Sequence, residues 1–300
     1  MKNLLLVIIG LCLFNNLTIA QPAKSEDNNR SNPASDTYNV EQAQTLLGDN
    51  FFGPEEIKTA FGLEISDKAI PVIPFTKADL QRAKELKQFL ILRWPISIEK
   101  MNSILKGRTA YGGKIFFDYD TADYRFKKRA WYTEENFFLT DDSVLPYWVL
   151  VSNGLLPNSA NKNYCQQTDV IAAYLKTIVY KNRIMPQSCQ NAIEQWETQS
   201  KEVKYELTKG SETRADSLLN ASLINRLFRP TPRDIIYDLI LIYHNQKKMQ
   251  LLKKSYALSR GIDKKGLRVY LGYFDAEGLT FQKTGTEDID TEVGTILQMR

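Results

Sequence analysis

The chain has 300 residues, of which 43% are hydrophobic and 25% are charged, so it can bury a substantial core as an ordinary globular protein. Its formal net charge is only +4, and an excess this small gives no indication of nucleic-acid binding or of a membrane-surface role. After the first twenty residues no apolar run approaches the length of a transmembrane helix, so none is expected.

The first twenty residues have the layout of a secretory signal peptide. Lys2 gives a positive start, residues 4–14 are almost all apolar, and small residues precede an expected cleavage site after Ala20. We therefore predict a mature protein that works in the periplasm or outside the cell. Residues 21–37 are polar and rich in Asn, Ser and Pro, which predicts a disordered spacer. A single α+β domain is expected over residues 38–300.

Short helices and strands are expected up to residue 151. Pro54 at a first helical position and the capping-box pattern of Thr76 with Asp79 mark two helix starts. The continuous apolar run at 89–92 predicts a strand that is buried on both faces. The predicted helices are 41–47, 54–61, 77–87 and one from Ile98 that ends at Gly107, and the predicted strands are 89–92, 114–119 and 145–151.

From Asn163 onward, apolar residues at spacings of three and four predict long helices. Thr231, Pro232 and Asp234 form the clearest helix start, with an N-cap, a first-position proline and an acidic first turn. The predicted helices are 169–180, 189–207, 213–228 and 232–258, and a hairpin over 267–283 and a strand over 294–299 follow. This order predicts an α+β fold with one mixed or antiparallel sheet, a long-helix segment in the C-terminal half and a closing β-hairpin.

Two cysteines remain after removal of the leader. Cys165 and Cys189 form a candidate disulfide, because the expected compartment is oxidising. If Cys165 begins a helix that runs to Tyr180, however, residues 181–188 would have to fold straight back to bring the sulfurs together. The alternative is a pair of buried thiols, and the spacing leaves both open.

The sequence contains no recognised catalytic or metal-binding pattern. His244 is the only histidine, so a histidine-activated nucleophile would depend on it, and no such nucleophile pattern accompanies it. Zinc-type Cys and His spacings are missing, and the Asp-rich stretches at 118–123 and 288–292 lack the glycine of a calcium loop. We therefore expect neither a metal ion nor a cofactor.

Aromatic and charged residues gather in the segment 118–142, which is the preferred contact surface. The candidate binding residues are Tyr124, Arg125, Lys128, Trp131 and Tyr132. For a protein outside the cytoplasm, a glycan, a peptide or an envelope protein is a better candidate partner than nucleic acid. A purely structural alternative is an edge strand that its Lys and Arg residues protect from aggregation.

Carboxylates in the same segment allow a second function. Glu134, Glu135 and the aspartates of 118–123 lie among aromatic residues, as in carbohydrate sites. Two such carboxylates are sufficient for acid–base hydrolysis. The alternative to a binding protein is therefore a carboxylate-dependent hydrolase of cell-wall or other polysaccharide.

Several short stretches of the sequence, taken together, resemble a family of uncharacterised bacterial proteins. They are GPEEI at 53–57, AFG at 60–62, IPF at 73–75, AKEL at 83–86, FLILR at 89–93, WVLVS at 148–152, PNS at 157–159, NY at 163–164 and QT at 167–168. The resemblance implies a bacterial protein with one folded unit, and it implies no activity and no catalytic residue. We therefore expect an exported bacterial protein with a non-enzymatic binding or structural role in the cell envelope or exterior.

Overall fold

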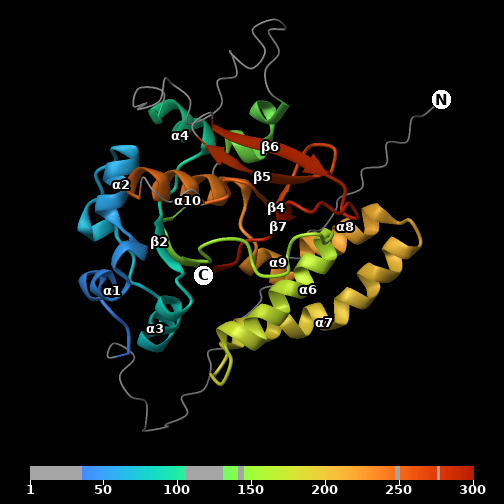
Figure 1. The fold of residues 1–300 in the computed structure, drawn as a ribbon, viewed down its shortest axis with the longest axis horizontal. Coiled ribbons are helices and arrows are strands. Elements are labelled where there is room, and N and C mark those ends of the chain that lie inside the picture. The colour runs from blue at the N-terminus through green and yellow to red at the C-terminus, as the bar shows by residue number, and fades with distance from the viewer. Residues whose placement is uncertain (1–35, 106–130, 141–144, 247–250, 276–277) are drawn as a thin grey trace, which may run out of the picture. The chain divides into compact units, whose positions relative to one another are not determined.

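Two four-stranded sheets and a set of helices make up the part of the chain that the computed structural model describes, namely residues 36–105, 131–140, 145–246, 251–275 and 278–300 (Figure 1). The predicted α+β class is confirmed. The helices are α1 (Val40–Leu47), α2 (Pro54–Phe61), α3 (Lys77–Glu85), α4 (Ile98–Leu105), α5 (Asn136–Leu139), α6 (Tyr164–Tyr174), α7 (Gln187–Thr208), α8 (Glu212–Ala221), α9 (Leu223–Phe228) and α10 (Pro232–Asn245). The strands are β1 (Phe51–Phe52), β2 (Phe89–Arg93), β3 (Tyr147–Val151), β4 (Tyr256–Ile262), β5 (Arg268–Asp275), β6 (Gly278–Thr284), β7 (Val293–Gly294) and β8 (Gln298–Met299).

The first sheet has the strand order β1-β2-β3-β8. β2 and β3 are antiparallel, with Leu90 opposite Leu150, while β1 runs parallel to β2 and β8 runs antiparallel to β3. Every residue of β2 is buried, as the apolar run predicted for a strand covered on both faces. Arg93 is the one charged residue of this buried strand, so it needs partners inside the protein.

The closing hairpin belongs to a second sheet, which corrects the prediction of a single sheet. β5 and β6 pair as predicted, and β4 and β7 complete the order β6-β5-β4-β7. The sequence prediction missed β4 because it continued the preceding helix to residue 258. In the structure α10 ends at Asn245, and the apolar residues described from Leu251 onward belong to a turn and to β4. Short apolar runs fit both periodicities, which explains the error.

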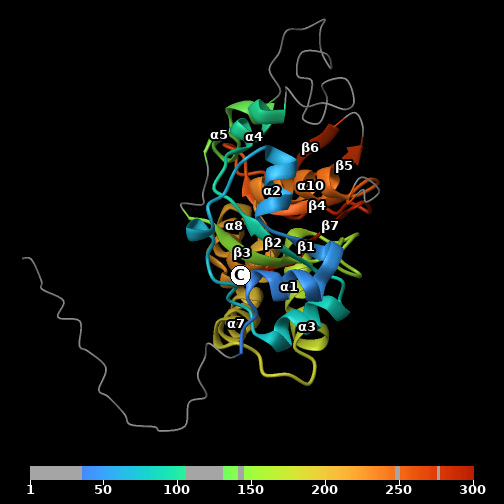
Figure 2. The same cartoon turned by 90° about the vertical axis from the view of Figure 1, so that its left-hand side faces the viewer.

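Helix α10 lies between the two sheets. It contacts β2 on one side and β4 and β5 on the other, and α2 lies against it (Figures 1 and 2). All residues from Pro232 to Ile242 are buried, including three charged ones. A helix covered on all sides must pair its polar side chains within the protein.

The helices after β3 pack against one another, with α6 and α7 side by side (Figure 1). Helix α6 begins at Tyr164, five residues before the predicted start, with a capping box at Asn163, and a π-helical turn (Leu175–Val179) extends it. Ser222 has an extended conformation that divides the predicted helix 213–228 into α8 and α9.

Some predictions lie outside the described residues. They are the signal peptide, most of the spacer and the strand at 114–119. Within the described ranges, no helix combines the length and the apolar character that a membrane crossing needs.

Candidate functional site

Two of the five predicted binding residues lie in the described part of the chain. Tyr124, Arg125 and Lys128 lie outside it. The Tyr132 side chain is buried and stacks on Phe281 of β6, with the ring centroids 4.3 Å apart. Trp131 is half-buried, and the ammonium of Lys283 lies 4.6 Å from its ring centroid. Both aromatic rings therefore pack against the second sheet.

Of the carboxylates considered for hydrolysis, some lie among the described residues and others lie outside them. The aspartates of 118–123 lie outside the described residues. Glu135 is buried and accepts a hydrogen bond from the backbone N–H of Lys264 at 3.0 Å, whereas Glu134 is exposed. Among the residues with described positions, no group of three metal-ligating side chains is arranged to hold an ion.

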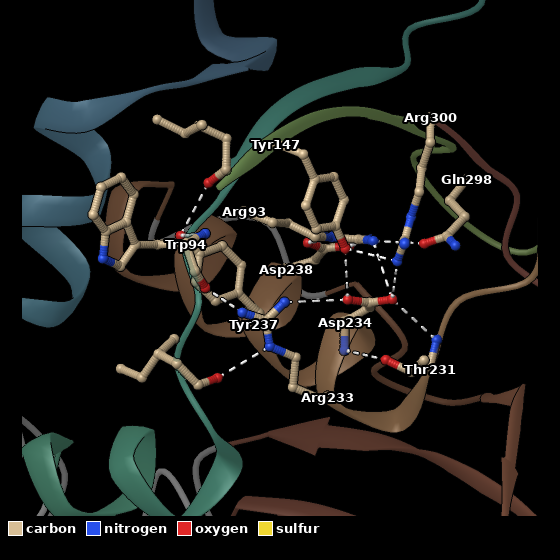
Figure 3. Close-up of polar contacts among 12 residues, drawn as sticks. Arg93, Trp94, Tyr147, Thr231, Arg233, Asp234, Tyr237, Asp238, Gln298 and Arg300 are labelled. Carbon is tan, nitrogen blue, oxygen red and sulfur yellow. Dashed lines mark hydrogen bonds and ion pairs between the residues drawn. The ribbon is translucent and has the colours of Figure 1, made fainter. Parts of the chain in front are cut away.

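A buried network of charges lies where β2, β8 and α10 meet (Figure 3). We call it the Arg93 cluster. Arg93 is completely buried and donates from Nε and Nη2 to the two carboxylate oxygens of Asp238, at 3.0 and 2.5 Å. Its Nη1 donates to Gln298 at 2.5 Å and lies 3.3 Å from Asp234. The members of the cluster are Arg93, Tyr147, Arg233, Asp234, Asp238, Gln298 and Arg300.

Asp234 is the most heavily bonded carboxylate of this cluster. It accepts hydrogen bonds from Tyr147 at 3.1 Å and from Arg300 at 3.2 Å, and it closes the capping box of α10 with Thr231. Burial would raise the pKa of Asp234, but the guanidiniums of Arg93 and Arg300 outweigh that effect. The pKa is therefore held well below its usual range, and the carboxylate stays ionised.

Asp238 has the opposite shift although it also binds Arg93. Its burial outweighs the attraction of the guanidinium, so the pKa of Asp238 is raised. Asp234 and Asp238 lie one turn apart on the same face of α10 and point to the same arginine (Figure 3). Two carboxylates that are buried and bonded in this way join structural elements and are not accessible to a substrate.

A cavity of about 190 Å³ adjoins the Arg93 cluster and shares Arg300 with it. We call it the Arg82 cavity. Its wall is formed by α3, by the connection from α6 to α7, by the first turn of α7 and by residues of β3, α9 and β8. Apolar side chains make up much of this wall, among them Phe75, Leu150, Val179, Phe228 and Met299.

The end of α3 positions two hydrogen-bond donors at this cavity. Lys87 adopts a left-handed conformation, and the backbone N–H of Gln88 then donates to Ala83 at 2.8 Å, which ends the helix and leads directly into β2. Gln88 is 2% exposed, and its Nε2 has no hydrogen-bond partner among the described residues. The same is true of Nε of Arg82, six residues earlier in the last turn of α3.

Other polar groups of the Arg82 cavity are paired with each other or stay neutral. Arg183 donates to Asp79 at 3.0 Å, and Asp79 also closes the capping box of α3. Burial raises the pKa of the Cys189 thiol to about 12, and it also raises the pKa of Tyr180. Both groups therefore stay protonated near neutral pH.

Cys165 and Cys189 are buried free thiols in the structure, which is the second of the two alternatives that the sequence left open. Burial raises the pKa of Cys165 to about 11. Neither cysteine has the lowered pKa that a reactive thiol requires.

Sequence reasoning missed both the Arg93 cluster and the Arg82 cavity. A signal for the first existed, because Arg93 ends an apolar strand and Asp238 lies within the apolar run of α10. A charged residue in such surroundings predicts a buried ion pair. The cavity has no comparable signal, since Arg82 and Arg183 are distant in the sequence and neither belongs to a motif.

Comparisons with known proteins add no further evidence on the site. No known protein family, no curated protein and no solved structure matches this chain. The resemblance to uncharacterised bacterial proteins therefore stays an expectation from the sequence.

Proposed function

We propose that this protein is exported and binds a small ligand in the Arg82 cavity without converting it. The observation that carries the proposal is the pair of buried donors, Nε of Arg82 and Nε2 of Gln88, that lack partners at one cavity. A buried donor without a partner costs about 1–3 kcal/mol, so most buried donors in folded proteins are paired. Two such donors beside the same cavity support a ligand or an ordered water as the missing partner.

The chemistry of the wall favours binding over catalysis. Asp79 is the carboxylate among the described lining residues, and it is occupied by Arg183 and by its own helix cap. Cys189 is the thiol, and its raised pKa leaves it protonated and a poor nucleophile. A wall with these groups can recognise a ligand, but it offers neither a paired acid and base nor an activated nucleophile.

Export is proposed from the first twenty residues. The test is the mass of the protein that is recovered outside the bacterial cytoplasm, which should begin at Gln21. A matched variant, Ile9→Asp, places a charge in the apolar core of the leader and should keep the protein inside the cell at its full mass. Recovery of both proteins in the cytoplasm, uncleaved, would contradict export without affecting the proposed cavity.

The binding function is tested with the mature protein, residues 21–300, by thermal shift against neutral, cationic and anionic small molecules. Ser188 is exposed and lines the cavity, so Ser188→Trp should close it without disturbing the core. Gln190→Trp adds the same ring at an exposed position of α7 that does not line the cavity. We expect ligands that raise the melting temperature of the parent and of Gln190→Trp but not of Ser188→Trp. A shift that Ser188→Trp keeps would place binding elsewhere and overturn the proposal.

A further inference from the structure

We propose that the ligand of the Arg82 cavity is a small monocarboxylic acid with an apolar body. This inference rests on the proposed function and names the chemical class of the ligand. It follows from the size of the cavity, from the balance of charge in its wall, and from the position of the two donors that lack partners.

The volume sets the size of the ligand. An engineered apolar cavity of about 150 Å³ in another protein holds one benzene molecule. The Arg82 cavity, at about 190 Å³, therefore has room for roughly eight to ten non-hydrogen atoms. This size admits a benzoate or a short branched fatty acid, and it excludes an oligosaccharide or a folded peptide.

The charge of the wall favours an anion. Three arginines, Arg82, Arg183 and Arg300, line the cavity, and Asp79 is the one carboxylate side chain among its lining residues. Arg183 pairs with Asp79, whereas the partners of Arg82 and Arg300, namely Glu85 and Asp234, do not line the cavity. The first turn of α7, a helix of 22 residues, also forms part of the wall through Ser188. The positive end of the helix dipole adds to the attraction for a negative charge.

Arg82 and Gln88 both line the cavity, and each has one buried nitrogen donor without a partner. Nη1 of Arg82 donates to Glu85 at 2.7 Å and Nη2 donates to the carbonyl of Ile178 at 2.6 Å, so the guanidinium is fixed and its Nε remains available. Gln88 follows six residues later at the same end of α3 and contributes its side-chain amide. A carboxylate has two oxygens and can accept one hydrogen bond from each donor.

The rest of the wall determines the other end of the ligand. Phe75, Leu150, Val179, Phe228 and Met299 offer hydrocarbon contacts and no polar group for a second charge. An ion that is polar on all sides, such as inorganic phosphate, would place some of its oxygens against these apolar side chains, where they have no partner. An apolar body attached to one carboxylate matches both parts of the cavity.

The test compares ligands that differ only in charge. Calorimetric titration of the mature protein uses benzoate against benzamide, 4-methylpentanoate against its amide, and inorganic phosphate. We expect each acid to bind at least about tenfold more tightly than its amide, because hydrogen bonds to a charged group are worth more than those to a neutral one. We expect phosphate to bind more weakly than either acid.

Variants of the two donors test the geometry. Gln88→Met and Arg82→Lys each remove one donor while keeping most of the side-chain volume, and each should weaken binding of the acid about tenfold. The matched control is Gln199→Met, because Gln199 of α7 also has a buried amide atom without a partner but does not line the cavity. Thermal unfolding of each variant separates a loss of binding from a loss of fold.

The outcomes separate this inference from the proposed function. Equal affinity for acid and amide, or tighter binding of phosphate, would overturn the carboxylate assignment. Failure of both acids to bind would also overturn it, and the proposed function would still stand if a neutral or cationic compound bound and Ser188→Trp abolished that binding. If Ser188→Trp abolished the binding of no compound of any class, both proposals would fail.

Discussion

The Arg93 guanidinium and the Asp238 carboxylate form a two-point hydrogen bond that is buried from solvent, although 145 residues separate them in the chain. This contact joins the end of β2 to the middle of α10, the helix that lies between the two sheets. Gln298 of β8 binds the same guanidinium. One side chain therefore connects early, middle and late parts of the sequence.

Removal of this guanidinium should destabilise the whole fold. Arg93→Met leaves Asp234 and Asp238 buried without their shared counter-charge, and breaking a buried pair in this way costs about 3–5 kcal/mol. The measurement is urea unfolding followed by circular dichroism. As a control, Arg214→Met removes an exposed partner of Glu202 and should leave the midpoint nearly unchanged. Equal midpoints for the two variants would show that the cluster does not hold the fold together.

The stability should depend on acid pH through Asp234. Its pKa is lowered in the fold, whereas an unfolded aspartate titrates near 3.9, so the folded state binds fewer protons in this range. The contribution of Asp234 is fully present above about pH 5 and decreases as the pH falls through 4 toward the folded pKa. Asp234→Asn should therefore be less stable than the parent by about 2 kcal/mol at pH 7, and the difference should shrink toward pH 2.5.

Asp238→Asn provides the matched comparison. The pKa of Asp238 is raised in the folded state, so its contribution to stability has the opposite pH dependence to that of Asp234. The contribution decreases as the pH rises through the pKa that Asp238 has in the folded state. Urea unfolding at several pH values measures both differences. Parallel curves for the parent and the two variants would contradict the assigned directions.

Gly272 is required by the close approach of two strands. A Cβ at this position of β5 would lie 2.0 Å from the carbonyl oxygen of Ser255 and 2.7 Å from Cα of Tyr256. Because both atoms belong to the backbone, Gly272→Ala must displace β4, and we expect a loss of about 2–4 kcal/mol in thermal unfolding. Gly154→Ala, where a Cβ meets nothing within 4 Å, should be neutral or slightly stabilising.

Lys87 is a site where a glycine should improve stability. Its φ of 54° places a residue with a Cβ in the left-handed region at the end of α3, and its side chain is exposed. Lys87→Gly should raise the free energy of unfolding by about 1 kcal/mol, since the left-handed conformation costs a residue with a Cβ about that much. Lys87→Ala retains the Cβ and should give no gain, and a gain of equal size in both variants would assign the effect to the lost charge instead.

The two cysteines should remain free thiols after export. Protein recovered from outside the cytoplasm is unfolded in an alkylating reagent without reductant, and its mass should increase by two alkyl groups. In the native state both residues should react slowly, because burial raises the pKa of Cys165 to about 11 and that of Cys189 to about 12. An unlabelled protein that gains two groups only after reduction would show a disulfide.

Local signals in the sequence predicted many of the helix starts. The capping boxes at Thr76 and Thr231 and the first-position Pro54 all begin helices at the predicted residues. These signals are reliable because the hydrogen bonds involved join residues three positions apart. The buried strand β2 was also predicted, since its apolar run is continuous.

The ends of elements and the pairing of strands were harder to predict. The predicted helix 232–258 extends past the end of α10 at Asn245, and Gly261 of the missed strand β4 lies so close to Pro232 that a Cβ would come within 2.5 Å of the proline ring. That constraint comes from tertiary packing and leaves no local pattern. The two donors of the Arg82 cavity likewise leave no local pattern in the sequence. Arg82 and Gln88 come to line a cavity only when the connection to α7 covers them.

Residues 293–299 link the two sheets, because β7 pairs with β4 in one and β8 pairs with β3 in the other. Among the strands described, these two are the last to leave the ribosome. The partner that β8 supplies to β3, and the Gln298 amide that Arg93 needs, are therefore missing during most of translation. Such late, long-range pairing slows folding. We therefore expect the pairing that links the two sheets to form only after residues 293–299 have been synthesised.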